Sequence, residues 1–149
     1  MKIYLDVSCL NRPFDDQAQA RVRLESEAVT LILEKIDAGR WEQVSSRMAE
    51  IEILAIPNEV RRRRVLQLLP GSRMELGPTV FDRARQLVEQ GLQAADAVHV
   101  AAAEGLQTDV FLTCDDRLLA RCQQIADDLT IAVANPLKWL EEQDDATNP

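Results

Sequence analysis

The sequence has few of the residues on which several common kinds of site depend. It contains a single histidine, so its catalytic groups must come largely from other residue types. Its five glycines form no glycine-rich phosphate loop, which argues against a nucleotide-binding fold. The three cysteines, Cys9, Cys114 and Cys122, show neither zinc-ligand spacing nor a disulfide framework. We therefore expect reduced thiols that mostly fill the core.

Long apolar runs and positive charge are also scarce. No stretch is long enough to span a bilayer, and Asp6 interrupts the N-terminus before an apolar region of signal-peptide length can develop. We expect a cytoplasmic protein with no membrane partner. Its 17 Lys and Arg residues are outnumbered by 25 Asp and Glu residues, which gives a net charge of −8. This charge opposes non-specific binding to nucleic acid unless part of it lies in one pocket that metal ions neutralise.

Predicted strands alternate with predicted helices along the whole chain, with no repeat and no linker. Strands are expected at residues 2–7, 41–45, 74–76, 109–113 and 130–134. Helices are expected at 20–38, 46–55, 59–69, 79–91, 94–104, 117–129 and 137–142. The pattern predicts an α/β fold with helices on both faces of a mostly parallel sheet. The length suits a single domain, expected at 1–142, with a flexible tail at 143–149.

Several of these segments carry finer expectations. The helix at 20–38 has an apolar stripe that includes Leu24, Ala28, Leu31 and Ile32, and its other face is charged. The continuous apolar run at 109–113 is typical of a central strand that is covered on both faces. The alanine-rich helix at 94–104 is expected to be buried against the sheet. A loop is expected between the first strand and the first helix.

Four carboxylates stand where a parallel sheet builds its sites. Ligands bind beyond the carboxyl ends of the strands, at the point where the strand order reverses. Asp6 directly follows Ile3–Leu5 near the end of the first predicted strand, and Asp115 follows the apolar run. Glu52 and Asp96 lie on helices expected to flank that edge. Asp96 also stands among alanines and valines, where a cation is one of the few ways to keep a carboxylate ionised. We expect Asp6, Asp96 and Asp115 to converge on one pocket.

Such a cluster suits a hard divalent cation. Magnesium prefers carboxylate and water oxygens, and a bound divalent ion can activate water and stabilise charge on a leaving oxygen. Without a cation, converging carboxylates would repel one another and shift their pKa values. No histidine base is required, which fits a chain whose only histidine is His99.

Four segments resemble, in this order, the signature regions of PIN-domain proteins, and specifically of their VapC-like toxin branch. They are Tyr4–Asn11, Val44–Ser46 with Glu52–Leu54, Ala95–Ala101, and Phe111–Asp115. The resemblance extends from Met1 to about Leu140. It implies a three-layer α/β/α sandwich, a Mg²⁺ or Mn²⁺ site, and an endoribonuclease that cuts RNA phosphodiester bonds. It also implies that the chain is the toxin of a type II pair, restrained by a cognate antitoxin.

The resemblance also assigns roles to individual residues. The catalytic and metal-binding positions are Asp6, Glu52, Asp96 and Asp115. Ser8 and Thr113 match hydroxyl positions that support the site in relatives.

Two assignments compete with a neighbouring acid. Glu50 and Glu52 point to different helix faces, so only one can face the pocket, and we prefer Glu52. Asp116 competes with Asp115, and the Thr-x-Asp spacing favours Asp115, although Asp115 could instead cap the helix that follows. His99 shares a helix face with Asp96, but we expect it to be a packed, hydrogen-bonded residue.

Other interpretations remain open. The run Arg61–Arg64 with Arg73 could grip phosphates, face solvent or meet an acidic partner. A homodimer is expected from the long helix at 20–38 and the apolar segments that flank Pro57. The main alternative function is a catalytically weak PIN-fold module that acts through a protein or RNA partner. A phosphatase or receiver-like protein with Asp6 as phosphoryl acceptor is disfavoured, because the Asp-x-Asp motif and a suitable late lysine are missing.

Overall fold

The computed structural model describes the backbone of residues 1–147 and the side chains of residues 1–143. Within this range four strands form one sheet, in the spatial order β2-β1-β3-β4. They are β1 (Lys2–Leu5), β2 (Glu42–Val44), β3 (Val110–Leu112) and β4 (Ala132–Ala134). All three neighbouring pairs are parallel, which confirms the predicted parallel α/β fold.

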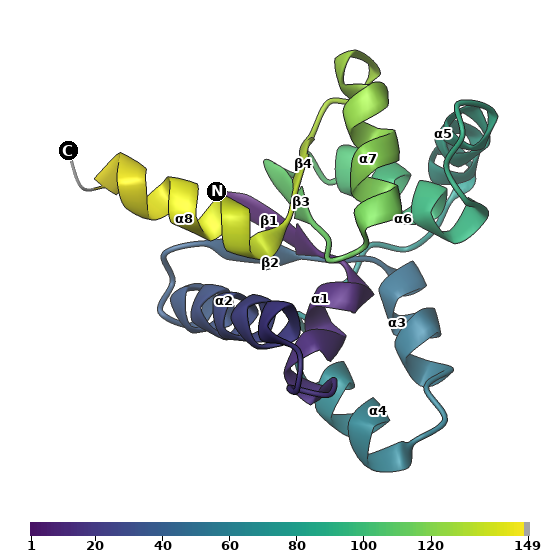
Figure 1. Cartoon of the computed structure of the whole chain (residues 1–149). Coiled ribbons are helices and arrows are strands. Elements are labelled where there is room, and N and C mark those ends of the chain that lie inside the picture. Colours follow the sequence, from purple (N-terminus) through teal and green to yellow (C-terminus); the bar gives the residue numbers. More distant parts are fainter. Residues whose placement is uncertain (148–149) are drawn as a thin grey trace.

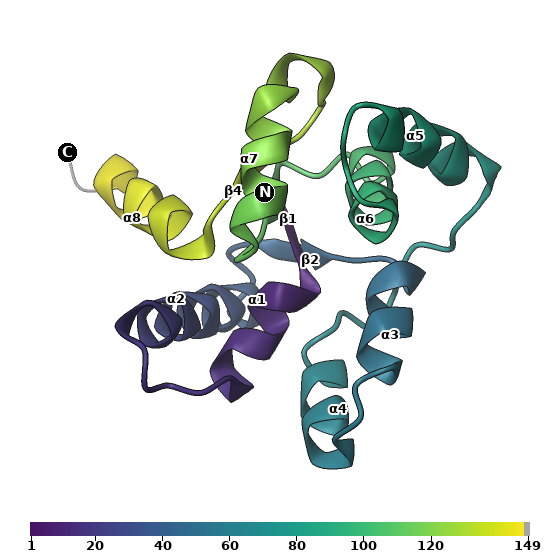
Figure 2. The same cartoon turned by 45° about the vertical axis from the view of Figure 1, so that its right-hand side comes forward.

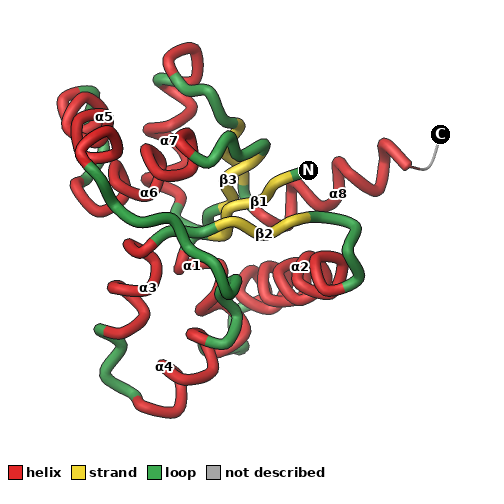
Figure 3. The backbone as a smooth tube through the Cα atoms, turned by 180° about the vertical axis from the view of Figure 1, so that it is seen from behind, coloured by secondary structure: helices red, strands yellow, loops and turns green. Residues whose placement is uncertain are grey.

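Helices cover both faces of the sheet (Figures 1 and 2). They are α1 (Val7–Asn11), α2 (Ala20–Asp37), α3 (Arg47–Leu54), α4 (Glu59–Leu66), α5 (Pro78–Glu89), α6 (Ala94–Gly105), α7 (Asp116–Gln124) and α8 (Pro136–Thr147). Two short 3₁₀ turns are also present, η1 (Arg12–Phe14) and η2 (Ala126–Asp128). Viewed from behind, α5, α6 and α7 lie on one side of the strands, and α1 to α4 lie on the other (Figure 3).

Alternation along β1 explains this three-layer arrangement. Successive side chains of a strand point to opposite faces. Ile3 and Leu5 enter one core with residues of α1, α2 and α3, whereas Tyr4 enters the other core with residues of α5 and α6. The three residues of β3 are also fully buried, as expected for a central strand. The predicted α/β/α sandwich is therefore confirmed.

The sheet order places a reversal point beside β1. The chain moves from β1 to β2 on one side of it, and β3 then pairs with its other side. The carboxyl ends of β1 and β3 are neighbours at this point, and each strand is followed there by a short turn into a helix. This is where open parallel sheets bind ligands.

The segment between β1 and α2 is a loop, as predicted, only at residues 15–19. It forms α1 directly after Asp6 and continues through η1 with Pro13 in its first turn, where a missing N–H costs nothing. The predicted strand at 74–76 is also wrong, because only one bridge pairs Met74 with Ser46 before Gly77 begins the next helix.

Some boundaries and one helix phase also differ from the predictions. Helix α5 begins at Pro78, α4 and α7 end earlier than predicted, and α8 runs from Pro136 into the segment expected to be a tail. Residues 148 and 149 of that expected tail lie outside the described residues. In α2, Leu24 and Leu31 are exposed and Glu25 is buried, so the predicted stripe is partly out of phase. None of the described helices is long and apolar enough to cross a membrane.

Candidate metal centre

Asp6 lies at the carboxyl end of β1 and begins α1. Its main-chain N–H donates to the carbonyl of Leu112 on β3 over 2.9 Å, which joins the ends of the two central strands. The hydroxyls of Ser8 and Thr113 both donate to Asp6 Oδ2 over 2.7 Å. The side chain is 6% exposed. Asp6 is therefore held in one orientation by neutral donors, both of which bind its Oδ2.

Glu52 and His99 join Asp6 from the two helical layers. Glu52 lies on α3 and His99 on α6, and these helices pack on opposite faces of the sheet. One ligand atom from each of the three side chains lies within 4.8 Å of the others. Glu50 instead forms ion pairs with Arg47 at 2.7 Å and Arg73 at 3.0 Å. The phase of α3 therefore turns Glu52, and not Glu50, toward Asp6.

Asp96 is the third predicted carboxylate near this point. It lies in the first turn of α6 and is half-buried, less enclosed than its alanine-rich context suggested. The pKa of Asp96 is raised to about 6. Burial is the largest cause, the negative charges of Asp6, Asp115 and Glu52 add to the rise, and His99 opposes it. Asp96 therefore experiences the charges of all three other predicted site acids.

Asp115 follows β3 and has two structural contacts of its own. It is the N-cap of α7, and its Oδ1 accepts from the main-chain N–H groups of Arg117 at 2.9 Å and Leu118 at 3.3 Å. Asp115 therefore does cap α7, but this contact uses only one of its two carboxylate oxygens. Asp116 is turned away and makes a bidentate pair with Arg21, with both distances 2.6 Å.

His99 has an unusual set of neighbours for a buried histidine. It is 1% exposed, and its Nδ1 lies 2.7 Å from the hydroxyl of Tyr4, which is in turn 2.7 Å from Ser46 Oγ. Its Nε2 lies 2.9 Å from Glu52 Oε1, but the oxygen is off the direction of a ring N–H. Nε2 is therefore buried without a hydrogen-bond partner. Burial lowers the pKa of His99, but Glu52, Asp6 and Asp96 raise it more, so it stands above its usual value.

The expectation of a packed, hydrogen-bonded His99 was therefore incomplete. The residue is packed, and it also stands at the acidic cluster. Its position three residues after Asp96, on the same helix face, was the signal in the sequence.

The donor set fits a divalent cation. Among the described residues, no lysine or arginine forms an ion pair with the four predicted site acids. Asp6 accepts from hydroxyls and Asp115 from main-chain N–H groups, and His99 lies beside Glu52. Mutual repulsion of carboxylates is what raises the pKa of Asp96 after burial. A hard cation would remove that repulsion and would find the oxygen ligands that it prefers.

Two other features lie away from this cluster. Three arginines of the run have partners inside the molecule: Arg61 with Asp15, Arg62 with the carbonyl of Ile56, and Arg63 with Glu59. With these partners, the arginine run is less available to bind phosphates.

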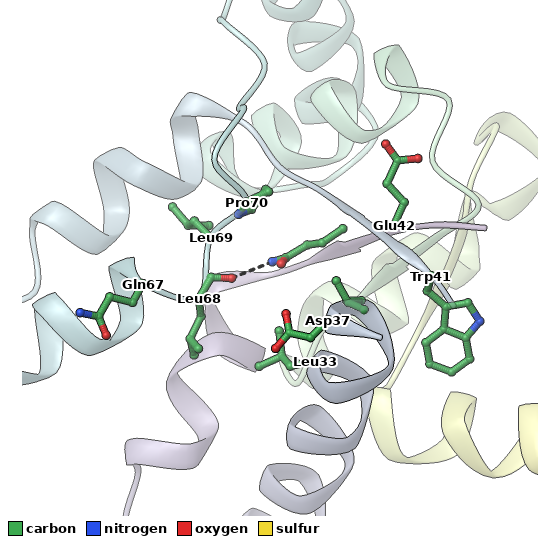
Figure 4. Close-up of a pocket in the computed structure, with 10 residues that line it drawn as sticks. Leu33, Asp37, Trp41, Glu42, Gln67, Leu68, Leu69 and Pro70 are labelled. Atoms are coloured by element: carbon green, nitrogen blue, oxygen red, sulfur yellow. Dashed lines mark hydrogen bonds between the residues drawn. The ribbon is translucent and has the colours of Figure 1, made fainter. Parts of the chain in front are cut away.

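A pocket of about 410 Å³ opens beside β2 and is lined by residues such as Leu33, Trp41 and Leu68 (Figure 4), but none of the predicted site acids lines it.

The fold and the acidic cluster together define a class of protein: a parallel α/β domain with carboxylates gathered at the reversal point of its sheet. A family model described as "PIN domain" matches residues 3–123. The chain therefore belongs to the PIN-domain family, which confirms the resemblance seen in the sequence.

Solved structures with a similar fold agree with this assignment. One is FitAcB from Neisseria gonorrhoeae, with 20% identity and a TM-score of 0.58, over 90% of this chain and 97% of that chain. Another is FitAB bound to an IR36 DNA fragment, with 22% identity and a TM-score of 0.56, over 91% of this chain and 95% of that chain. They share the fold of this chain. No curated protein sequence matches this chain.

Proposed function

We propose that this chain is a Mg²⁺- or Mn²⁺-dependent endoribonuclease that cuts RNA phosphodiester bonds. The observation that carries the proposal is a group of carboxylates near Asp6 that have no lysine or arginine partner among the described residues. A structural acid in a protein interior is normally paired with a cationic side chain. Here Asp6 and Glu52 gather with His99 within 4.8 Å, and Asp96 experiences the charges of Asp6, Asp115 and Glu52. Among the described residues no lysine or arginine pairs with these acids, an arrangement that suits a divalent cation.

Each group of residues would have its own part in this activity. The cation would be held by Asp6, Glu52, Asp96 and Asp115. When bound, a divalent cation supplies Lewis-acid stabilisation of the charge that develops on the phosphate and leaving oxygens, and it makes an attacking water more acidic. Ser8 and Thr113 fix the carboxylate of Asp6, and Thr113 Oγ1 also accepts from the main-chain N–H of Asp115 over 3.0 Å. The two hydroxyls therefore couple the ends of β1 and β3.

We also propose that the protein is the toxin of a type II pair and has a cognate antitoxin. Two similar structures have names, FitAcB and FitAB, that join two components, and one of them is bound to DNA. The alternative is a catalytically weak PIN-fold module that binds RNA or protein through the same surface. The acidic cluster favours catalysis, because a surface made only to bind RNA would not gather carboxylates.

The test is RNA cleavage by the untagged full chain on single-stranded and structured RNA, with Mg²⁺ or Mn²⁺ titrated from zero. We expect no cleavage in excess chelator and recovery when the cation is restored. Asp115→Asn should lose most activity, and Asn is itself a good N-cap, so α7 should remain folded. Asp116→Asn is the matched control and should remain active. Activity in excess chelator would refute the metal mechanism, and a folded, cation-loaded protein that cuts no RNA would favour the binding module.

A homodimer is a further part of the proposal. Leu24 and Leu31 of α2 are about half exposed, as are Ile51 and Leu54 on α3. Burial of such side chains against a second copy would be favourable. Light scattering at micromolar concentration tests this, and a monomer there would contradict it.

A further inference from the structure

Packing alone does not explain the surroundings of the buried His99 imidazole. Its Nε2 is buried, has no hydrogen-bond partner, and stands 2.9 Å from Glu52 Oε1 beside Asp6. We propose that His99 is itself a ligand of the cation through Nε2, so that the site has one nitrogen ligand among its carboxylates. This inference rests on the proposed function, because it concerns the same cation.

The distances suit a shared ion. In an octahedral shell with ligands about 2.1 Å from the metal, adjacent ligands lie about 3.0 Å apart and opposite ligands about 4.2 Å apart. The separation of 2.9 Å between His99 Nε2 and Glu52 Oε1 matches an adjacent pair. The atoms offered by Asp6, Glu52 and His99 all lie within 4.8 Å of one another. Small side-chain adjustments would therefore bring all three onto one ion.

The other ring nitrogen has the kind of support that metal-bound histidines normally have. A ligating histidine usually donates its second ring N–H to a fixed neighbour, which sets the tautomer. Here Nδ1 faces the Tyr4 hydroxyl, and Tyr4 faces Ser46 Oγ. If Nδ1–H donates to Tyr4 and Tyr4 donates to Ser46, the lone pair of Nε2 is free for a cation. Tyr4 is fixed by stacking on Phe111, with ring centroids 5.1 Å apart.

The opposite proton arrangement is less well satisfied. If Tyr4 donated to Nδ1, the proton would lie on Nε2, and Glu52 would be the only nearby acceptor for it. The direction of that N–H does not meet Glu52 Oε1, so a buried donor would be left without an acceptor. A cation between Nε2 and the carboxylates removes this defect.

A nitrogen ligand has a consequence for the choice of metal. Imidazole suits transition-metal ions, whereas Mg²⁺ prefers oxygen ligands and water. The site should therefore bind Mn²⁺ more tightly than Mg²⁺, and this preference should depend on His99.

The direct test uses Mn²⁺ as the probe and the fact that the chain has only one histidine. Electron spin-echo envelope modulation of Mn²⁺ bound to the untagged full chain should show imidazole ¹⁴N coupling, and ¹⁵N-histidine labelling should change it. Such a signal can arise only from His99. Bound Mn²⁺ without imidazole coupling would overturn this inference and leave the proposed nuclease intact. Failure of the folded wild type to bind Mn²⁺ or Mg²⁺ at all would overturn both.

Calorimetry of Mn²⁺ and Mg²⁺ binding to variants gives a second test. Tyr4→Phe keeps the ring and removes the hydroxyl that supports Nδ1, and we expect its Mn²⁺ affinity to fall by about 10- to 100-fold. His99→Asn should lose the preference for Mn²⁺ over Mg²⁺. Thr108→Val, at a buried hydroxyl before β3 and hence at the opposite end of the sheet, is the matched control and should bind as the wild type does. An equal loss of Mn²⁺ and Mg²⁺ affinity in His99→Asn would contradict a ligand role, and if that variant does not fold, Tyr4→Phe and the wild-type spectrum decide.

Discussion

Glu25 and Asp6 are both buried carboxylates, yet their surroundings are opposite. Glu25, 1% exposed, accepts from Arg12 at 2.9 Å, Arg21 at 3.4 Å and Asn135 at 2.6 Å. Asp6 accepts only from hydroxyls and faces other acids. The first carboxylate has its counter-charge within the protein and joins α2 to neighbouring segments. The second carboxylate has no such counter-charge. This difference separates a carboxylate that would bind a cation from one that stabilises the fold.

The largest expected effect follows from removing the charge of Asp6. Asp6→Asn should lower RNA cleavage by about 100-fold or more, because stabilisation of transition-state charge by a metal is worth several kcal/mol. The melting temperature in chelator should be unchanged or higher, since one repelling charge is gone. Cleavage assays beside thermal unfolding test this. If the variant simply unfolds, Asp6 belongs with Glu25 as a structural acid and the contrast between them is lost.

Glu25→Gln should show the reverse pattern. The guanidinium groups of Arg12 and Arg21 would lose a buried partner, and breaking a buried pair costs about 3 kcal/mol or more. For a domain of this size the melting temperature should fall by about 10 °C. Chemical denaturation measures the loss, and Mn²⁺ affinity of the folded fraction should remain that of the wild type. Unchanged stability would show that the Glu25 network contributes nothing to the fold.

Asp96→Asn should reveal repulsion within the cluster as a pH-dependent gain in stability. The pKa of Asp96 is raised from 3.8 to about 6 in the folded protein, so its ionised form disfavours folding. The penalty is absent below about pH 4, develops as the pH rises toward 6, and is complete above that. In chelator at pH 7.5 the variant should be more stable by about 1 kcal/mol after screening, or about 3 °C.

Melting curves from pH 4 to pH 8 test this prediction, and the advantage of the Asn variant should disappear at the acid end. A constant difference across that range would mean that Asp96 does not feel its neighbours as described. Added Mn²⁺ should stabilise the wild type more than the variant, because the cation relieves the repulsion.

The smallest effect is expected for Glu50→Gln, which sharpens the contrast within one helix. Glu50 is paired with Arg47 and Arg73 near the surface, and such pairs contribute little to stability. Its cleavage and melting temperature should stay close to the wild type, whereas Glu52→Gln should lose cation affinity. A loss of cation binding in Glu50→Gln alone would reverse the assignment of the two acids.

Much of the fold could be predicted because its signals are local. The short strand-forming segments at 2–7 and 109–113 predicted the two central strands. The predicted start of a helix at residue 46 agrees with Ser46, whose hydroxyl caps α3. The phase of α2 was harder to predict, because Leu24 and Leu31 look like core residues and Glu25 does not. The spacing of Val22, Glu25, Val29 and Ile32 does follow one helix face. Burial of Glu25 was missed because it depends on Arg12 and Asn135, which are distant in sequence.

For the site, the sequence determined which acids follow β1 and β3, because a strand's carboxyl end is set by its own residues. It also narrowed the choices between Glu52 and Glu50 and between Asp115 and Asp116. Only the tertiary structure decided what each rejected acid does: Glu50 meets Arg73, and Asp116 meets Arg21. The tertiary structure also decided that His99 of α6 lies beside Glu52 of α3. Such contacts join residues far apart in the chain, so no local pattern of one sequence specifies them.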